Sequence, residues 1–507
     1  MVRLRNASTF EIKFAVTRVS VTQAFYSKGN NILNNSMAYH SQFNERECTC
    51  LSVDLSPFTK LYRPENIRLY KLFEREGYEL RIAGAGVCDL LLDVEPDRIE
   101  YAVYATPNQL KEMCQKYDIR IFSRREENFD HFALLVDNRF NFCITTVRND
   151  ASPSRSTGMD VCNSAWKRNA AKREFTVTAM FITLDLSTLP ENSRNTLPHC
   201  VSREHSANQH ATSVFKGCVY DYYGGLQDVQ NRRVRFVGDP SIRMRESPIK
   251  ILRYFLFHGH VVRPAEWDVH DPEILKAVVE NVAALDDVPG DRCWTELRRI
   301  LHCHSAPLLF RRMSHLGILP YLGFQWVPDF PQMDAAWARG ILRSAPDPAT
   351  CLATLVSNLE QAEKLFTRLQ LKTLERKIMC YIIRNRERCA QIPENVATEH
   401  FRRELLLSDV SSRSMHKVML EMMNYLAYDV QIITEWSIWV APKFPVTRND
   451  IADAWSIPRN EIRFYLSALR RQWVDSNCLW KTEHLLSTAN RAVVDDLVRR
   501  LRTEPFH

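Results

Sequence analysis

Residues 80–107, LRIAGAGVCDLLLDVEPDRIEYAVYATP, predict a strand, a tight turn, a helix and a second strand. The apolar run 80–83 leads into a turn of small residues, which are Gly84, Ala85 and Gly86. Such a turn at the start of a helix exposes backbone N–H groups that suit a nucleotide phosphate. In the second strand residues two apart share a face, so we expect positions 98 and 100 to point the same way.

The sequence around this stretch predicts a chain with two parts. Short β-prone runs alternate with helical segments from about residue 61 to 237, which indicates an α/β head domain. From Glu246 onward almost every segment has helical periodicity, so the second half is predicted to be all-α. The predicted strands are 80–83, 99–103, 131–136, 141–147 and 234–237, and the predicted helices include 274–285, 294–301, 351–369, 374–387 and 461–473.

Composition sets the class of the protein. The chain has 507 residues, enough for several domains, and 45% of them are hydrophobic. No apolar run approaches the roughly 20 residues that span a bilayer, so we expect no membrane segment. The net charge of +7 suits an RNA partner without requiring one. The 14 cysteines show no zinc-type spacing, and we expect them to be reduced thiols.

Two segments differ in composition from the rest. Residues 1–44 are basic and rich in Ser, Thr and Asn, which is typical of a mitochondrial presequence; the alternative is a disordered basic tail. Translation from Met37 would give a cytoplasmic or nuclear form. Residues 187–213 are polar, contain two prolines and lack periodicity, so they are expected to be an insertion in the head domain.

The opening stretch resembles the class II tRNA nucleotidyltransferases, the CCA-adding enzymes, and their relatives the bacterial poly(A) polymerases. That family has LRIAGGAVRDLL followed by PxDIDFATxATP, and its two aspartates hold two Mg²⁺ ions that activate the RNA 3′-hydroxyl and stabilise the triphosphate. Here these positions are Arg98 and Glu100, and the arginine of the glycine-turn motif is Cys88. The resemblance leaves Glu100 as the residual metal carboxylate and implies Asp89 as a further nucleotide-site residue.

Asp97 is a candidate replacement for the lost carboxylate. On a strand its side chain points to the face opposite Glu100, so a bulge would be needed for both to reach one metal ion. We therefore expect Asp97 not to act as a ligand.

Two further segments extend the resemblance. Residues 141–148, NFCITTVR, are similar to the family's NFEITTLR, which places Cys143 at another former carboxylate position. Residues 169–181, NAAKREFTVTAMF, are similar to DAERRDLTINAMF. The resemblance implies that Lys172 and Arg173 keep the basic pair that grips the triphosphate, and that Glu174 stands for an aspartate that contacts the ribose.

The base-reading motif is also altered. Residues 243–255, RMRESPIKILRYF, resemble RIxEDYLRILRYF, in which an Asp and an Arg on one helix face bond to the incoming base. In this chain the pair is Ser247 and Lys250, within a segment that also supplies Glu246 and Arg253 as expected nucleotide-site residues. Serine is short and uncharged and lysine lacks the planar fork of arginine, so base discrimination should weaken.

The resemblance extends over about residues 55–487 and implies an α+β fold. It predicts a nucleotidyltransferase-type head domain with a mixed β-sheet at 55–240, a helical neck and RNA-binding domain at 241–325, and a helical body and tail at 326–507. The altered residues cluster on catalytic motifs, which identifies the chain as a divergent member of the family with degenerate catalytic motifs.

Three functional hypotheses follow. The first is a pseudoenzyme that binds tRNA or other RNA, with nucleotidyl transfer lost or strongly reduced. The second is an active mitochondrial enzyme that adds CCA to tRNA 3′ ends from CTP and ATP with Mg²⁺, using Glu100 as its main metal ligand. The third is a non-catalytic subunit of an RNA-processing complex, with the insertion 187–213 as a docking segment. An active paralogue is a possible partner of an inactive chain.

Overall fold

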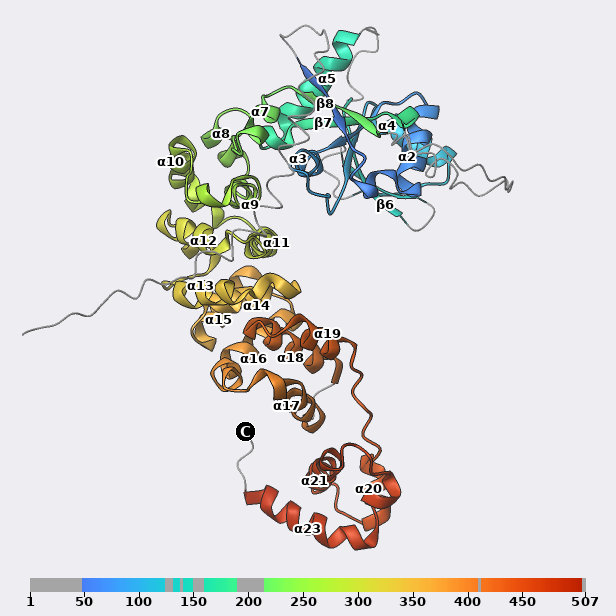
Figure 1. Cartoon of the computed structure of the whole chain (residues 1–507), viewed down its shortest axis with the longest axis vertical. Helices are drawn as coiled ribbons and strands as arrows, with labels where there is room; N and C mark the ends of the chain where they lie inside the picture. Colours follow the sequence, from blue (N-terminus) through green and yellow to red (C-terminus); the bar gives the residue numbers. More distant parts are fainter. Residues whose placement is uncertain are drawn as a thin grey trace, which may run out of the picture. The chain divides into compact units, whose positions relative to one another are not determined.

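The computed structural model (Figure 1) describes residues 48–123, 131–136, 140–148, 159–188, 214–408 and 412–503. The predicted presequence and nearly all of the predicted insertion lie outside the described residues. A search of the described helices finds none long and apolar enough to cross a membrane.

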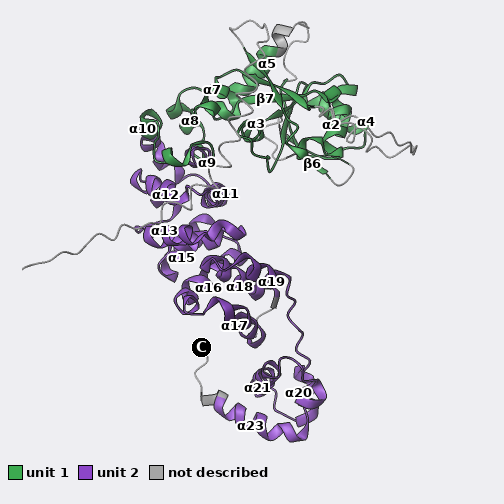
Figure 2. Cartoon of the chain, viewed as in Figure 1, with its two compact units in different colours: residues 1–250, 260–277 green, residues 251–259, 278–507 purple. Residues whose placement is uncertain are grey.

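The chain divides into two compact units, which Figure 2 colours green and purple. The first unit comprises residues 1–250 and 260–277, and the second comprises residues 251–259 and 278–507. Helices α9 (Lys250–Val261) and α10 (Pro272–Asn281) supply residues to both units.

The first unit is built on a mixed sheet of eight strands, which confirms the predicted head fold. The strand order is β1-β8-β7-β2-β3-β6-β5-β4, and all neighbours are antiparallel except β3 and β6. Parallel neighbours need a long connection, which here passes through α4 and the β4–β5 hairpin. The strands are β1 (Thr49–Asp54), β2 (Leu80–Ala83), β3 (Glu100–Val103), β4 (Arg120–Ser123), β5 (His131–Val136), β6 (Phe140–Thr146), β7 (Met180–Leu184) and β8 (Lys216–Asp221).

Register decides which residues share the face that carries helix α5. Strands β2 and β3 pair so that Arg81 lies opposite Ala102 and Ala83 lies opposite Glu100. These paired side chains point to one face because neighbours across a ladder share a side. The small Ala83 and Ala102 side chains leave room for the ring of Trp166 from α5, which is completely buried there. Glu100 therefore lies at the edge of a packed helix–sheet core.

The opposite face of the sheet is covered by α2. Tyr101, which alternates with Glu100 along β3, is buried, and its hydroxyl group donates to Asn66 Oδ1 of α2 at 3.0 Å. The helices of the first unit are α2 (Pro64–Arg75), α3 (Ala85–Leu91), α4 (Pro107–Lys116), α5 (Met159–Lys172), α7 (Gly225–Gln230) and α8 (Pro240–Glu246), with parts of α9 and α10.

The second unit is entirely helical in its described residues, as predicted. Its helices are amphipathic, and in α11 the buried side chains include Trp294, whose Nε1 atom donates to Glu375 of α16 at 3.0 Å. The helices are α11 (Gly290–Leu301), α12 (Ala306–His315), α13 (Phe330–Arg339), α14 (Pro348–Leu352), α15 (Leu359–Leu369), α16 (Thr373–Ala390), α17 (Glu394–Leu407), α18 (Ser412–Leu426), α19 (Val430–Ile438), α20 (Arg448–Trp455), α21 (Ile462–Asp475), α22 (Thr482–Leu485) and α23 (Thr488–Thr503).

Two predicted elements are wrong. The strand predicted at 234–237 is reduced to an isolated bridge between Phe236 and Phe175, because its apolar side chains are buried in loop packing rather than in a ladder. The helix predicted at 351–369 is interrupted after α14, since Asn358 adopts an extended conformation and its side chain caps α15 by accepting from the Gln361 N–H group.

The prediction that every cysteine is reduced is also wrong. Cys50 and Cys218 form a disulfide, although 168 residues separate them in the sequence. The pairing follows from the antiparallel ladder of β1 and β8, in which Ser52 lies opposite Cys218 and Cys50 lies one diagonal step away. The spacing of the cysteines along the chain gives no indication that Cys50 and Cys218 are neighbours in the fold.

Candidate functional site

The turn at the end of β2 brings several predicted site residues together. Gly84 has φ 77° and ψ −148°, a conformation that residues with a side chain rarely adopt. A Cβ atom at Gly84 would lie 3.0 Å from Glu100 Oε2 and 3.2 Å from Arg173 Nη1. A Cβ atom at Gly86 would lie 3.3 Å from the Arg98 carbonyl oxygen. Glycine at position 84 therefore allows the Glu100 carboxylate and the Arg173 guanidinium group to approach the same turn.

Helix α3 carries three further residues of the glycine-turn motif. Ala85 begins the helix and is partly exposed, whereas Cys88 is fully buried, and burial raises the pKa of its thiol far above its usual range. The Asp89 carboxylate is held by α9, because its Oδ1 atom lies 2.7 Å from His260 Nε2. Sequence reasoning missed His260, which lies 171 residues further along the chain. No local pattern marks such a contact.

The parallel pair β3–β6 carries the three positions at which the resemblance implies carboxylates. Glu100 is the first residue of β3 and lies directly opposite Cys143 of β6. Arg98 precedes β3, is exposed, and its Nη2 atom donates to the Cys143 Sγ atom at 3.3 Å. The Arg98 and Cys143 side chains are therefore in contact near the start of β3.

These residues do not fit the two Mg²⁺ ions that the family resemblance implies. Mg²⁺ requires hard oxygen ligands in near-octahedral geometry, and of the three positions Glu100 alone supplies a carboxylate. The permanent positive charge of Arg98 repels a cation, and the thiol of Cys143 is a soft ligand. Across the described ranges, no group of three His, Cys, Asp or Glu side chains could hold a metal ion.

Asp97 lies away from Glu100. It lines a cavity of about 260 Å³ together with Asn66, Tyr101 and Phe142, a cavity that Arg98 also borders. Tyr101 and Phe142 alternate with Glu100 and Cys143 along their strands and so point to the opposite face of the sheet. Asp97 precedes β3, so strand alternation does not fix the direction of its side chain.

The C-terminal end of α5 supplies the predicted basic pair. Lys172 is exposed and ends the helix, and Arg173 follows it. Burial lowers the pKa of the Arg173 guanidinium group to about 10, an effect that the nearby negative charge of Glu100 opposes. Arg243 of α8, which sequence reasoning missed, donates from Nη2 to the carbonyl oxygens of Lys172 at 2.9 Å and Arg173 at 2.6 Å. Glu174 is partly buried directly after the pair.

The base-reading positions are arranged differently from the helix face that the resemblance implies. Helix α8 ends at Glu246, and Ser247 is extended with φ −160° and ψ 100°, so Ser247 and Lys250 do not lie on one helix. Pro248 explains the break, because a residue before proline avoids the helical conformation. The Lys250 ammonium group donates to Glu246 Oε2 at 3.1 Å, and Arg243 donates to the same atom at 2.8 Å.

These contacts have an electrostatic consequence for Glu246. The hydrogen bond from Lys250, followed by the charge of Arg243, lowers the pKa of the Glu246 carboxyl group. Lys250 is almost completely buried, and its ammonium group forms an ion pair with Glu246. The last predicted residue, Arg253, belongs to the second unit, where its Nε atom donates to Glu296 Oε1 at 2.9 Å.

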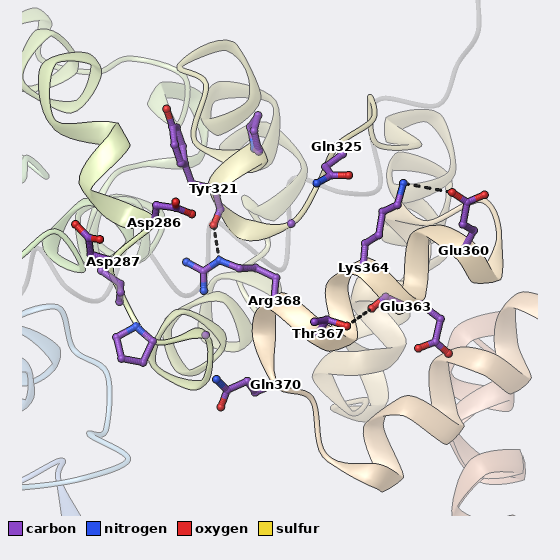
Figure 3. Close-up of a pocket in the computed structure, with 15 residues that line it drawn as sticks. Asp286, Asp287, Tyr321, Gln325, Glu360, Glu363, Lys364, Thr367, Arg368 and Gln370 are labelled. Atoms are coloured by element: carbon purple, nitrogen blue, oxygen red, sulfur yellow. Dashed lines mark hydrogen bonds and ion pairs between the residues drawn. The ribbon is translucent and has the colours of Figure 1, made fainter.

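A cavity of about 870 Å³ in the second unit is unsuited to phosphate (Figure 3). None of the predicted nucleotide-site residues lines it, and its wall carries the acidic residues Asp286, Asp287, Glu360 and Glu363. Its two cations are engaged within the wall: Lys364 lies 3.3 Å from Glu360, and Arg368 donates to the carbonyl oxygens of Tyr321 and Leu285 at 2.9 Å each.

Two protein-family models match parts of the chain. The model of the poly(A) polymerase head domain matches residues 80–193, and the model described as "Probable RNA and SrmB- binding site of polymerase A" matches residues 271–330. The chain is 28% identical over 453 residues to the CCA tRNA nucleotidyltransferase 1, mitochondrial, of Danio rerio, covering 89% of this chain and 96% of that protein.

Solved structures are similar in fold. The Bacillus stearothermophilus CCA-adding enzyme in complex with CTP aligns with a TM-score of 0.56 and 17% identity, covering 88% of this chain and 98% of that one. The Thermotoga maritima CCA-adding enzyme complexed with tRNA aligns with a TM-score of 0.51 and 16% identity, covering 90% and 100%. The family models, the relatives and the fold together support a member of the family of class II CCA-adding enzymes and poly(A) polymerases.

Proposed function

We propose that this chain binds tRNA or another structured RNA and that its nucleotidyl transfer is lost or strongly reduced. The observation that carries the proposal is the start of β3, where Glu100 lies opposite Cys143 and Arg98 contacts the Cys143 thiol. One carboxylate beside a guanidinium group cannot replace the acidic set that binds two metal ions.

The expected loss of rate is large. In two-metal sites the ions stabilise both the attacking and the leaving oxygen, and they depend on carboxylates for their positions. Each 1.36 kcal/mol of lost transition-state stabilisation corresponds to about tenfold in rate. Replacement of two carboxylates, with a cation at one position, is therefore expected to lower the rate by several orders of magnitude.

RNA is the proposed partner on three grounds. The RNA-binding model matches residues 271–330, the chain has a net charge of +7, and a structural neighbour is complexed with tRNA. Basic side chains bind the phosphate backbone by charge, and that binding weakens as salt is added. It does not require the metal site.

A mitochondrial location is proposed from two observations. Residues 1–44 have the composition of a presequence, and the matched Danio rerio relative is named as mitochondrial. An impaired chain that still takes part in CCA addition would need an active paralogue or an RNA-processing complex as its partner. Recovery of the protein from mitochondria with a processed N-terminus would support the location, and an unprocessed cytosolic chain would contradict it.

The function is tested with purified full-length protein and a tRNA that lacks its CCA end. We expect a complex with this tRNA that weakens as salt is raised, and no efficient incorporation of labelled CTP or ATP in the presence of Mg²⁺. Efficient incorporation that disappears in Glu100→Ala would overturn the proposal. It would establish the second candidate, an active CCA-adding enzyme, which the retained Glu100 and Arg173 at the Gly84 turn favour.

A further inference from the structure

One disulfide joins two neighbouring strands of the head sheet. Cys50 of β1 is bonded to Cys218 of β8, and both residues are partly exposed to solvent. Ten other cysteines of the described residues are free thiols, which is typical of a chain that folds where thiols stay reduced. In such surroundings an isolated disulfide is more often a redox-sensing element than a structural one. Because it is accessible, this disulfide can be attacked by a thiolate.

The disulfide lies in the half of β1 that has few buried side chains. β1 is at the edge of the eight-stranded sheet and pairs there with β8. Residues 49–52 are exposed or half-buried, whereas Val53 is buried. The chain that follows is anchored, because Leu55 is buried and its N–H group donates to the Phe215 carbonyl oxygen at 2.8 Å. Packing therefore contributes little to residues 49–52, and the disulfide at Cys50 is their main link to the sheet besides the ladder.

A row of facing residues crosses the sheet from the disulfide to the Gly84 turn. Residues that lie opposite each other in a ladder place their side chains on one face, so each side chain lies beside the next. The row therefore connects the disulfide with the carboxylate that borders the turn. Its members, in order, are Cys50, Tyr220, Phe181, Ala83 and Glu100.

Two arginines pack on the aromatic members of this row. The Arg81 guanidinium carbon lies 3.8 Å from the centre of the Tyr220 ring, and that of Arg173 lies 5.1 Å from the centre of the Phe181 ring. Such cation–π contacts depend on the position of the ring. Release of β1 would make β8 the edge strand and would leave Tyr220 without its neighbour Cys50.

We propose that the disulfide between Cys50 and Cys218 is a reversible redox switch that holds edge strand β1 on the sheet. The thiolate of a small thiol such as glutathione attacks one sulfur of the disulfide, which forms a mixed disulfide and breaks the bond between the two cysteines. The departing sulfur takes up a proton. A second glutathione thiolate attacks the mixed disulfide, so that oxidised glutathione leaves and the second cysteine thiolate is protonated. Two small thiols supply the two electrons, and oxidised glutathione reverses the steps.

Reduction affects a defined segment. In the reduced state the ladder hydrogen bonds remain, and edge segments with few buried contacts open at low cost in free energy. Residues 48–52 are then expected to open, whereas residues 53–58 stay in place because Val53, Leu55 and Phe58 are buried. The inference does not rest on the proposed function, since it concerns strand β1 and not the altered carboxylate positions.

Cys48 provides a matched control on the same segment. It is a free thiol two residues before Cys50. Burial raises the pKa of the Cys48 thiol, so little of the attacking thiolate form is present at neutral pH. We therefore expect the exchange to proceed through the small thiol and not through Cys48, and Cys48→Ser should leave the switch intact.

The first measurement tests reversibility. The full chain is equilibrated in buffers with graded ratios of reduced to oxidised glutathione, its free thiols are alkylated, and the state of Cys50 and Cys218 is read by mass spectrometry. We expect both cysteines to convert together, at the same ratio whether it is approached from the oxidised or the reduced side. A pair that stays oxidised in excess reduced glutathione would be a structural disulfide and would overturn the inference. A pair that stays reduced in oxidised glutathione would overturn it as well.

The second measurement is amide hydrogen exchange of the oxidised and reduced chain. Reduction should speed exchange at residues 48–52 by about tenfold or more and leave residues 53–58 nearly unchanged, which also shows that the head stays folded. Cys50→Ser and Cys218→Ser should exchange rapidly at residues 48–52 even in oxidising buffer, and Cys48→Ser should follow the wild type in both states. Equal exchange at residues 48–52 in the oxidised and reduced wild type would overturn the inference. Rapid exchange of oxidised Cys48→Ser would also overturn it.

Discussion

The two sides of the Gly84 turn have changed in opposite ways. On one side, the acidic edge, formed by positions 98, 100 and 143, has one carboxylate, where the resemblance implies three. On the other side, the basic edge is formed by Lys172 and Arg173, which are both cations. Arg243 donates hydrogen bonds to the backbone carbonyl oxygens of both residues. The β3–β6 ladder is made by backbone groups, so the acids could be replaced without moving a strand. The strand ladder therefore accepts substitutions at the acidic edge independently of the basic edge.

The largest expected effect comes from truncating Trp166, a buried residue of helix α5, the helix that ends at Lys172. Trp166 is fully buried over Ala83 and Ala102, and its Nε1 atom donates to Glu79 at 3.2 Å. Truncation of a buried tryptophan lowers the free energy of unfolding by about 3–5 kcal/mol. Trp166→Ala should therefore lower the urea midpoint of unfolding strongly. Trp166→Phe, which keeps most of the ring, is the control and should cost much less. Equal midpoints for Trp166→Ala and wild type would contradict the packing argument.

The second prediction rebuilds the acidic edge. The double variant Arg98→Asp, Cys143→Glu supplies carboxylates beside Glu100 and should raise Mg²⁺-dependent incorporation of CTP into tRNA by about 100-fold, which corresponds to roughly 2.7 kcal/mol. The single variant Cys143→Glu serves as control, because Arg98 would still repel the metal. No gain in the double variant would mean that the altered base-reading segment, and not the acidic edge, limits transfer.

The third prediction separates two effects of adding a side chain at Gly84, which are strain in the backbone and close contact with the Glu100 carboxylate. Gly84→Ala adds a Cβ atom 3.0 Å from the Glu100 carboxylate in a conformation that disfavours side chains, at an expected cost of about 1–3 kcal/mol with loss of nucleotide binding. Gly77 also has a positive φ, but a Cβ there meets nothing within 4 Å. Gly77→Ala should therefore lower stability without changing nucleotide affinity. Retained affinity in Gly84→Ala would disprove the close approach.

The smallest expected effect concerns the pH dependence of the Glu246 ion pair. A carboxyl group whose pKa is lowered in the folded state stabilises the fold above its ordinary value, here 4.5, and that stabilisation is lost as the pH falls through the lowered pKa. Glu246 is half exposed, so the effect on the unfolding midpoint should be slight. Glu246→Gln should remove this acid-side dependence. A variant with the same profile as wild type would show that the pair contributes nothing.

Local patterns predicted much of the fold. The strands at 80–83 and 131–136 have the predicted bounds, and the glycine turn lies where the small residues indicated. The errors have a common cause. Residues 234–237 are as apolar as a strand, yet a strand needs a ladder partner, and Phe236 has one bridge. The disulfide between Cys50 and Cys218 likewise depends on which strands become neighbours.

By itself the sequence determined several of the strands and helices, the all-α second half, and the presence of Arg98 and Cys143 where the resemblance implies carboxylates. Helical and strand periodicities are properties of short segments, so they can be recognised without the rest of the chain. Tertiary structure alone decided that Arg98 contacts Cys143, 45 residues away, and that Arg173 approaches the turn at Gly84. These contacts arise from strand register and helix packing, which join segments that carry no local trace of each other.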